Sequence, residues 1–206
     1  MLVARAPLTK PLLQSSVSPP DEDLVAQARQ GNHHAFRLLV ERHEDAIAAT
    51  VTAMLGPTAE VDDVVQEVFI RFYQTLDRFQ GKAALSTYLK RIAINRSLDA
   101  LRRRKRLLGR FFSRDDETRH LPDPAAENDE SLEAQERARL VHQAIQDLPP
   151  KHRAVVVLRL IEGYSTEETA ALLDIPYGTV LSRLSRAHDK LKERLAPYLH
   201  EKRPAD

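Results

Sequence analysis

The residues best suited to chemistry in this 206-residue chain are a run of cations near its middle. From Lys82 to Arg110 there are ten lysine and arginine residues and one acid, Asp99, a local charge of +9. In a helix, with about 100° between residues, one polar face of this segment would present Tyr88, Arg91, Asn95, Asp99, Arg102 and Arg106. A ring and an amide among guanidinium groups suit a nucleic-acid backbone and unstacked bases. The alternative is a solvated helix end, but its C-terminal dipole needs only about one or two cations, and 102–106 supplies five.

A second candidate binding segment runs from Ser165 to Leu195. Ser165 and Glu168 form a capping box that opens a short helix, and Pro176 suits the start of the next helix, where its missing amide hydrogen is not needed. The inward positions of that next helix are Val180, Leu184, Ala187, Leu191 and Leu195, and its outward positions are Leu181, Ser182, Arg183, Ser185, Arg186, Asp189 and Lys190. A basic helix after so short a turn favours a helix-turn-helix that enters a DNA major groove. An ordinary helical hairpin is the alternative.

The basic helix must be positioned by the amphipathic segment that precedes it. Apolar residues at a spacing of three and four predict one core-facing side, made of Val61, Val64, Val65, Val68, Phe69, Phe72, Leu76 and Phe79. A polar break follows at 80–82. We expect the basic helix itself to be buried on two sides, because it has two nearly opposite apolar stripes: Leu85, Leu89 and Ile92, and Ile94, Leu98 and Leu101.

Four further helices complete the prediction. Acids open the helix at 21–30, and Asn32 can cap the next, which Gly56 and Pro57 stop. Another helix runs over 132–148, and 151–162 is a short apolar helix. Its valine run also suits a strand, but no alternating pattern elsewhere predicts one. The sequence therefore predicts an all-α protein of two small helical domains joined by a flexible acidic linker, the second with a helix-turn-helix.

Charge divides the chain more sharply than the net value of +1 suggests. The segment 115–136 carries nine acids against one arginine, a local charge of −8 that nearly cancels the basic segment. We expect a disordered tail at 1–20, a first domain at 21–106, a linker at 107–131 and a second domain at 132–200.

Several kinds of site are not predicted. The chain has no cysteine, which excludes disulfides, thiolate metal sites and cysteine nucleophiles. Asp63 with Glu67 has a spacing that could ligate a metal, but His33, His34 and His43 lack a one-turn spacing with carboxylates on the same face. No phosphate loop, nucleophile elbow or dinucleotide motif occurs. We expect no enzyme activity, no cofactor and no metal. Without a signal-peptide or membrane-spanning run, we expect a cytoplasmic protein with no direct membrane association.

Three stretches together resemble the extracytoplasmic-function (ECF) group of bacterial sigma factors, which keep the second and fourth conserved sigma regions. They are Asp-Val-Val-Gln-Glu-Val-Phe at 63–69, Tyr-Leu-Lys-Arg-Ile-Ala-Ile-Asn at 88–95 with Leu-Arg-Arg-Arg at 101–104, and Gly-Thr-Val-Leu-Ser-Arg-Leu-Ser-Arg-Ala at 178–187. The resemblance covers about 21–106 and 132–195. Two such domains in this order are far more specific than any one motif.

The resemblance implies a non-catalytic subunit that binds core RNA polymerase, directs it to promoters and begins melting. Contact with the polymerase beta-prime clamp would fall to Asp63, Gln66, Glu67 and Arg71. The non-template strand of the minus-ten element would meet Phe79, Lys82, Ser86, Tyr88, Arg91, Asn95, Arg102, Arg103 and Arg106. The minus-thirty-five duplex would meet Ser182, Arg183, Ser185, Arg186 and Lys190. The beta flap and an anti-sigma protein are further implied partners.

Departures from the family pattern affect the expected base readout. Leu181 stands where the family usually has Lys or Arg, Ser185 replaces a frequent larger side chain, and His188 replaces a frequent Arg. We expect weaker or differently specified upstream binding. Two other functions compete: a stand-alone helix-turn-helix regulator, which usually dimerises although no heptad seam is present, and an RNA-binding adaptor, which leaves the second domain unexplained.

Overall fold

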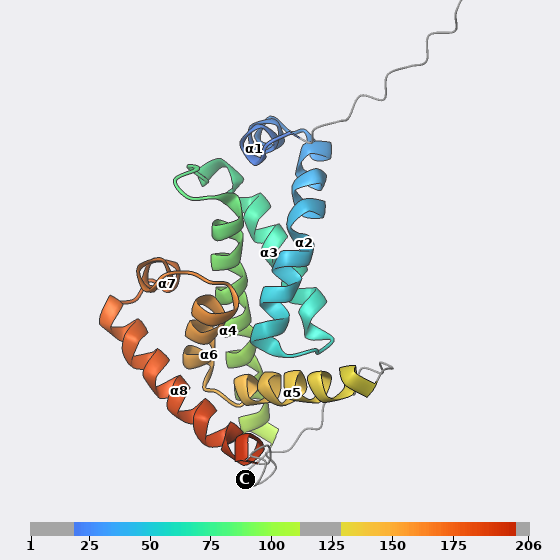
Figure 1. Ribbon diagram of the computed structural model, residues 1–206. Coiled ribbons are helices and arrows are strands. Elements are labelled where there is room, and N and C mark those ends of the chain that lie inside the picture. Colours follow the sequence, from blue (N-terminus) through green and yellow to red (C-terminus); the bar gives the residue numbers. More distant parts are fainter. Residues whose placement is uncertain (1–18, 112–128, 201–206) are drawn as a thin grey trace, which may run out of the picture.

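The computed structural model describes residues 19–111 and 129–200 of the chain. All regular elements in these two ranges are helical, as the sequence predicts, and none is a strand. Those of the first domain are α1 (Asp21–Arg29), α2 (His33–Leu55), α3 (Glu60–Thr75), the 3-10 turn η1 (Leu76–Arg78) and α4 (Leu85–Phe111). Those of the second domain are α5 (Asp129–Gln146), α6 (Pro150–Val156), the π-helical turn η2 (Val157–Ile161), α7 (Thr166–Leu173) and α8 (Tyr177–His200). Figure 1 shows their arrangement.

The core of the first domain lies between α2, α3 and α4, with α1 packed across one end (Figure 1). Phe72 of α3 is fully buried at its centre, and Leu39 of α2 and Leu89 of α4 are buried with it. The apolar spacing of α3 therefore identified the core face correctly. The prediction that α4 is covered on two sides is also confirmed, since Leu85, Leu89, Ile92 and Ile94 are buried while Leu98 and Leu101 are half-buried.

Local signals explain where several helices begin and end. Asn32 Oδ1 accepts hydrogen bonds from the backbone amides of His34 (3.0 Å) and Ala35 (3.2 Å), which caps α2. Gly56 ends this helix at φ +77°, in the left-handed region that glycine enters without strain. Ser165 and Glu168 form the predicted capping box of α7. These local contacts set where α2 begins and ends and where α7 begins.

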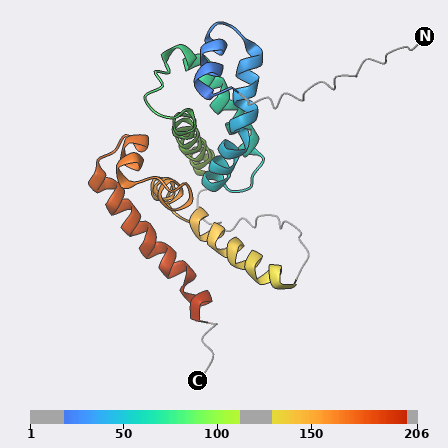
Figure 2. The same ribbon diagram turned by 45° about the horizontal axis from the view of Figure 1, so that its top comes forward.

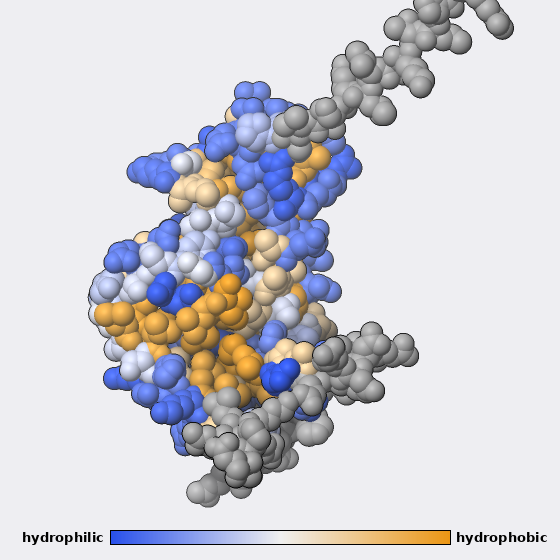
Figure 3. Space-filling model, in the orientation of Figure 1, coloured by the Kyte–Doolittle hydropathy of each residue, from blue (hydrophilic) through white to orange (hydrophobic). Residues whose placement is uncertain are grey.

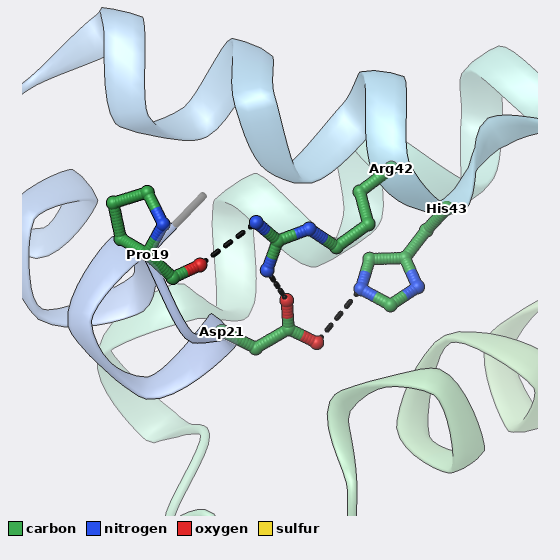
Figure 4. A network of polar contacts seen from close by, with 4 residues as sticks. All are labelled: Pro19, Asp21, Arg42 and His43. Atoms are coloured by element: carbon green, nitrogen blue, oxygen red, sulfur yellow. Dashed lines mark hydrogen bonds and ion pairs between the residues drawn. The ribbon is translucent and has the colours of Figure 1, made fainter. Parts of the chain in front are cut away.

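A polar network fastens α1 to α2 (Figure 4). One carboxylate oxygen of Asp21 accepts from Arg42 at 2.6 Å, and the other lies 2.8 Å from Nε2 of the buried His43. Arg42 also donates to the carbonyl of Pro19 at 2.7 Å. The start of α1 is therefore held at a fixed place on α2.

The second domain has a smaller core of its own. Its separate cluster consists of Ile145, Leu148, Val156 and Ala187, flanked by the half-buried Leu184 and Leu191. α7 and α8 form the predicted helix-turn-helix, with Asp174 in the left-handed conformation at the end of α7. The valine run at 155–157 is helical, not extended, and passes directly into η2.

The two domains share one continuous apolar cluster. Ala154, Val157, Leu158 and Leu172 of the second domain belong to the same cluster as the first-domain core. Figures 1 and 2 both show α6 lying between α4 and α8. Such a joint core was not predicted from the sequence.

Two helix ends differ from the predicted boundaries. α4 continues to Phe111, beyond the expected end at 106, and α5 begins at Asp129 rather than at 132. Asp129 and Glu130 extend α5 at a place where apolar periodicity does not predict a helix, and the mainly uncharged 107–111 extends α4 beyond its run of cations. The predicted linker at 107–131 is helical at both ends, and its central part, 112–128, lies outside the described residues, as do 1–18 of the predicted tail.

Candidate nucleic-acid interfaces

The polar face of α4 begins with an aromatic cluster. The half-buried ring of Tyr88 lies 5.0 Å from that of Phe79 and 6.2 Å from that of Phe72, centroid to centroid. Its hydroxyl is 3.0 Å from Oγ1 of Thr75, and the guanidinium of Arg91 lies 5.4 Å from its ring centroid. Tyr88 is therefore held in one place, with an exposed cation over its ring.

The loop before α4 is tied to α1 by a residue that the sequence reasoning missed. Arg29 Nε donates to the Leu76 carbonyl at 3.0 Å, and its Nη2 donates to the carbonyl of Phe79. The guanidinium of Arg29 thus holds the chain at both ends of η1, where the loop begins. In the sequence Arg29 is an ordinary cation in the last turn of a helix. No local pattern therefore predicts its contact with the loop.

The remaining predicted residues of this interface lie along α4 and in the loop before it. Lys82, Arg91, Asn95, Arg102, Arg103 and Arg106 are exposed, and Phe79 and Ser86 are half-buried. Asp99 contacts Arg102 at 2.8 Å and Arg96 at 3.2 Å, so part of the positive charge is compensated. Ion pairs this exposed contribute little to stability, and a phosphate could displace the carboxylate. The structure therefore presents a ring, an amide and several cations along one helix.

The predicted polymerase-contact residues share the outer side of α3. Asp63, Gln66 and Arg71 are exposed, while Glu67 is half-buried and lies 3.6 Å from Arg103 of α4. Beside them is a shallow apolar groove between α2 and α3, lined mainly by Phe36, Val40, Phe69, Ile70 and Tyr73. Ile70 is 56% exposed and Tyr73 is 47% exposed. Exposed apolar side chains next to charged ones are typical of a protein-binding surface.

The outward face of α8 is polar and open. Ser182, Ser185, Arg186 and Lys190 are exposed and Arg183 is half-buried, as the helical spacing predicts. Ser182 donates its hydroxyl to the Thr179 carbonyl at 3.1 Å, one turn earlier. Burial and then the positive charges of Arg186, Arg183 and Lys190 lower the pKa of His152 in neighbouring α6. Part of the lowering of this pKa thus comes from cations of α8.

The second domain also exposes apolar surface, which Figure 3 shows around the position of α6 and α8. Large exposed apolar side chains of its described part are Val141, Leu160, Ile161, Tyr177, Leu181 and Tyr198. Leu181 is 45% exposed near the start of the outward side of α8.

Two searches of the described ranges gave negative results. No group of three or more histidine, cysteine, aspartate or glutamate residues there lies close enough to hold a metal ion. Within those ranges no helix combines the length and apolar character needed to cross a membrane.

Comparison with known proteins identifies the two domains. The model of Sigma-70 region 2 matches residues 39–107, and that of Sigma-70, region 4 matches residues 138–191. The chain belongs to the sigma-70 family of RNA polymerase sigma factors, within its ECF group. It is thus a sigma factor of transcription initiation.

Similar proteins cover nearly the same length. The ECF RNA polymerase sigma-E factor of Haemophilus influenzae is 34% identical over 87% of this chain and 97% of its own. That of Escherichia coli K12 is 35% identical over 87% of this chain and 96% of its own. The solved structure of CnrH in complex with the cytosolic domain of CnrY is 32% identical, with a TM-score of 0.59 over 86% of this chain and 97% of that one.

Proposed function

We propose that the aromatic and basic face of α4 captures the non-template strand of the minus-ten element. The observation that carries this proposal is the fixed ring of Tyr88 with exposed Arg91 over it and exposed Asn95 one turn further along. An unstacked base can stack on such a platform, and stacking returns roughly 1–3 kcal/mol per base. Extracting a base costs a few kcal/mol, so binding energy alone would drive the first step of melting.

Upstream, the exposed face of α8 would read the minus-thirty-five duplex. Ser182, Ser185 and Arg186 are available for base edges, and Arg183 and Lys190 for phosphates. Because serine hydroxyls reach less far than longer side chains, we expect modest base discrimination at this element.

Core polymerase would dock on the outer side of α3. Asp63, Gln66, Glu67 and Arg71 supply charge there, and the adjoining groove supplies apolar contact through Ile70 and Tyr73. The exposed apolar surface of the second domain is suited to the polymerase beta flap. In this assignment 21–106 serves core and minus-ten binding, and 132–200 serves minus-thirty-five binding.

The same surfaces would serve a regulator. We assign an anti-sigma protein as a partner, supported by the solved complex of the similar CnrH with the cytosolic domain of CnrY. The protein itself would act without catalysis, cofactor or metal, in the cytoplasm where polymerase and promoters are found.

The test is open-complex formation on a fluorescent promoter fragment selected from a random library by the protein with core polymerase. Opening should require both proteins and should fall at least about tenfold when Tyr88→Ala and Asn95→Ala are combined, since each kcal/mol lost at the strand is several-fold in affinity. His33→Ala is the control, because this exposed ring at the start of α2 has no assigned role.

One outcome would overturn the proposal. Tight sequence-specific duplex binding by the protein alone, unchanged by polymerase, would favour a stand-alone helix-turn-helix regulator. In that case Tyr88→Ala would leave binding unaffected while Arg186→Ala would abolish it.

A further inference from the structure

The outward side of α8 carries a small apolar patch among polar residues. Leu181 is 45% exposed, and Tyr177, four residues earlier and so on the same side of the helix, is 49% exposed. Ser182 and Ser185 beside them are polar and exposed. The packing of this part of α8 is provided by the neighbouring Val180, which is fully buried. The side chain of Leu181 therefore faces solvent instead of the core of the domain.

The patch lies at the end of α8 that a helix-turn-helix presents to DNA. α8 follows α7 after a connection at 174–176, and Leu181 lies in its second turn. In this motif the N-terminal residues of the second helix contact base edges in the major groove. The space beside Gly178 is open, since a Cβ there would meet no neighbouring atom of the described chain within 4 Å. The first two turns of α8 can therefore approach a partner closely.

Cations accompany the patch along the same helix. Arg186 and Lys190 are exposed, and Arg183 is half-buried. An apolar protein surface would match Leu181 but would leave these cations without partners. The major groove of a DNA duplex offers both chemistries, because phosphates line its edges and thymine presents a C5-methyl group within it. The combination of an apolar patch with cations thus favours duplex DNA as its partner.

The chemistry of the leucine side chain limits which base it can face. Leucine has no hydrogen-bond donor or acceptor. Against the major-groove edge of guanine, adenine or cytosine, it would displace water from polar groups without replacing the lost hydrogen bonds. Against thymine it would instead bury the C5-methyl group, which is favourable. Leu181 would therefore both favour thymine and disfavour the other three bases.

We propose that Leu181 selects a thymine in the minus-thirty-five duplex by apolar contact with the C5-methyl group, and that Tyr177 helps to exclude water from this contact. The inference rests on the proposed function, since it names a base that α8 reads. The hydroxyl groups of Ser182 and Ser185 can supply hydrogen bonds to base edges. Leu181 adds a discrimination that hydrogen bonds cannot provide, because the methyl group neither donates nor accepts one.

Deoxyuridine tests this contact because its base differs from thymine only in lacking the C5-methyl group. Holoenzyme assembled from the protein and core polymerase would be titrated onto the fluorescent promoter fragment selected from the random library. Each thymine of the upstream element would be replaced by deoxyuridine in turn, on either strand. At one position the loss of the methyl group should weaken binding about three- to fourfold, the effect of one buried methyl group.

Variants of the protein assign that difference to Leu181. Leu181→Ala should bind the thymine and deoxyuridine fragments equally at this position, because alanine is too short to reach the methyl group. Leu107→Ala is the matched control, since this leucine of α4 is 55% exposed and has no assigned role, and it should keep the difference. In a fresh selection Leu181→Arg should prefer guanine there, because arginine pairs with O6 and N7 of guanine. Circular dichroism should show equal helicity in all three variants.

Three results would overturn the contact. They are an upstream element without thymine, equal binding of every deoxyuridine fragment by the parent protein, and a difference that persists in Leu181→Ala. Weaker binding of core polymerase by Leu181→Ala, with both fragments affected equally, would place the leucine against polymerase and would overturn the contact as well.

Arg186→Ala distinguishes a failure of this contact from a failure of the proposed function. If Arg186→Ala weakens promoter binding and no thymine shows a methyl-dependent difference, the leucine contact alone is wrong. If Arg186→Ala binds the promoter as the parent does, α8 does not read the duplex, and both the assignment of α8 and the leucine contact are wrong.

Discussion

The two proposed DNA-binding helices differ in how deeply they are packed against the rest of the protein. α4 lies on α2 and α3, with Leu89 and Ile94 buried and the ring of Tyr88 held against Phe72 and Phe79. α8 rests on a small cluster in which Leu184 and Leu191 remain half-buried. α4 is therefore a firmly packed helix, here called the platform, whereas α8 is less deeply buried.

This difference matches the role proposed for each surface. A base that leaves its stack needs a rigid place to land, because ordering a mobile ring at that moment would cost conformational entropy. A duplex keeps its own shape, so the helix that reads it needs only exposed side chains on a straight frame. We infer that a recognition surface is deeply supported where the protein, and not its ligand, must supply the order.

The largest expected effect is on the platform. Phe72→Ala should lower the free energy of unfolding by about 3–5 kcal/mol, since it empties a fully buried aromatic site. Leu191→Ala, under α8, should cost clearly less because its side chain is already half exposed to water. Urea unfolding followed by circular dichroism checks both. An equal loss of unfolding free energy in the two variants would contradict the difference in burial beneath α4 and α8.

A smaller effect should follow from removing the buried arginine of the second domain. Arg153→Met should cost about 3 kcal/mol, because carbonyls of Met54 in the first domain and Leu148 in the second lose their donor where the two domains meet. Arg194→Met is the control, since Arg194 makes an exposed ion pair with Asp147 that is about half open to solvent. Thermal unfolding of the two variants would measure the difference in their stability. A cost for Arg153→Met no greater than the control would mean that these bonds contribute nothing net.

The loop before α4 offers a finer test of the platform. Arg29→Ala should cost about 1–2 kcal/mol, from two hydrogen bonds to the carbonyls of Leu76 and Phe79. Hydrogen exchange should quicken at 80–84 while the α8 surface keeps its protection. Arg29→Lys should restore part of the loss through a single bond. Unchanged exchange in the loop would show that α1 does not position it.

The smallest effect concerns pH. Since the pKa of His152 is lowered in the folded protein, the unfolded chain binds the proton more readily, and stability rises with pH up to about the ordinary histidine value of 6.5. Below that value this contribution is lost progressively. His152→Gln should flatten the slope in unfolding experiments over about one pH unit below that value, and so should Arg186→Gln in part. A slope unchanged by His152→Gln would contradict the lowered pKa of His152, and one changed by His152→Gln but not by Arg186→Gln would assign the shift to burial alone.

The positions of the helices and most of their exposed faces follow from local sequence patterns. Helix ends are set by contacts within a few residues, as at Asn32, Gly56 and the Ser165–Glu168 capping box. A local sequence pattern can therefore predict them. The core face of α3 and the outward face of α8 follow from helical periodicity for the same reason. The sigma motifs then connected these surfaces to a family.

Tertiary structure alone decided which charges are engaged and how the domains meet. Glu162 accepts a hydrogen bond from Thr50, 112 positions away along the chain, and pairs with Lys90, 72 positions away, and no spacing rule connects residues so far apart. Arg153 stands next to a valine run, and only the fold shows that its guanidinium is needed by the carbonyl ends of two helices. Helix ends and amphipathic faces depend on neighbours in sequence, whereas buried charges depend on neighbours in space.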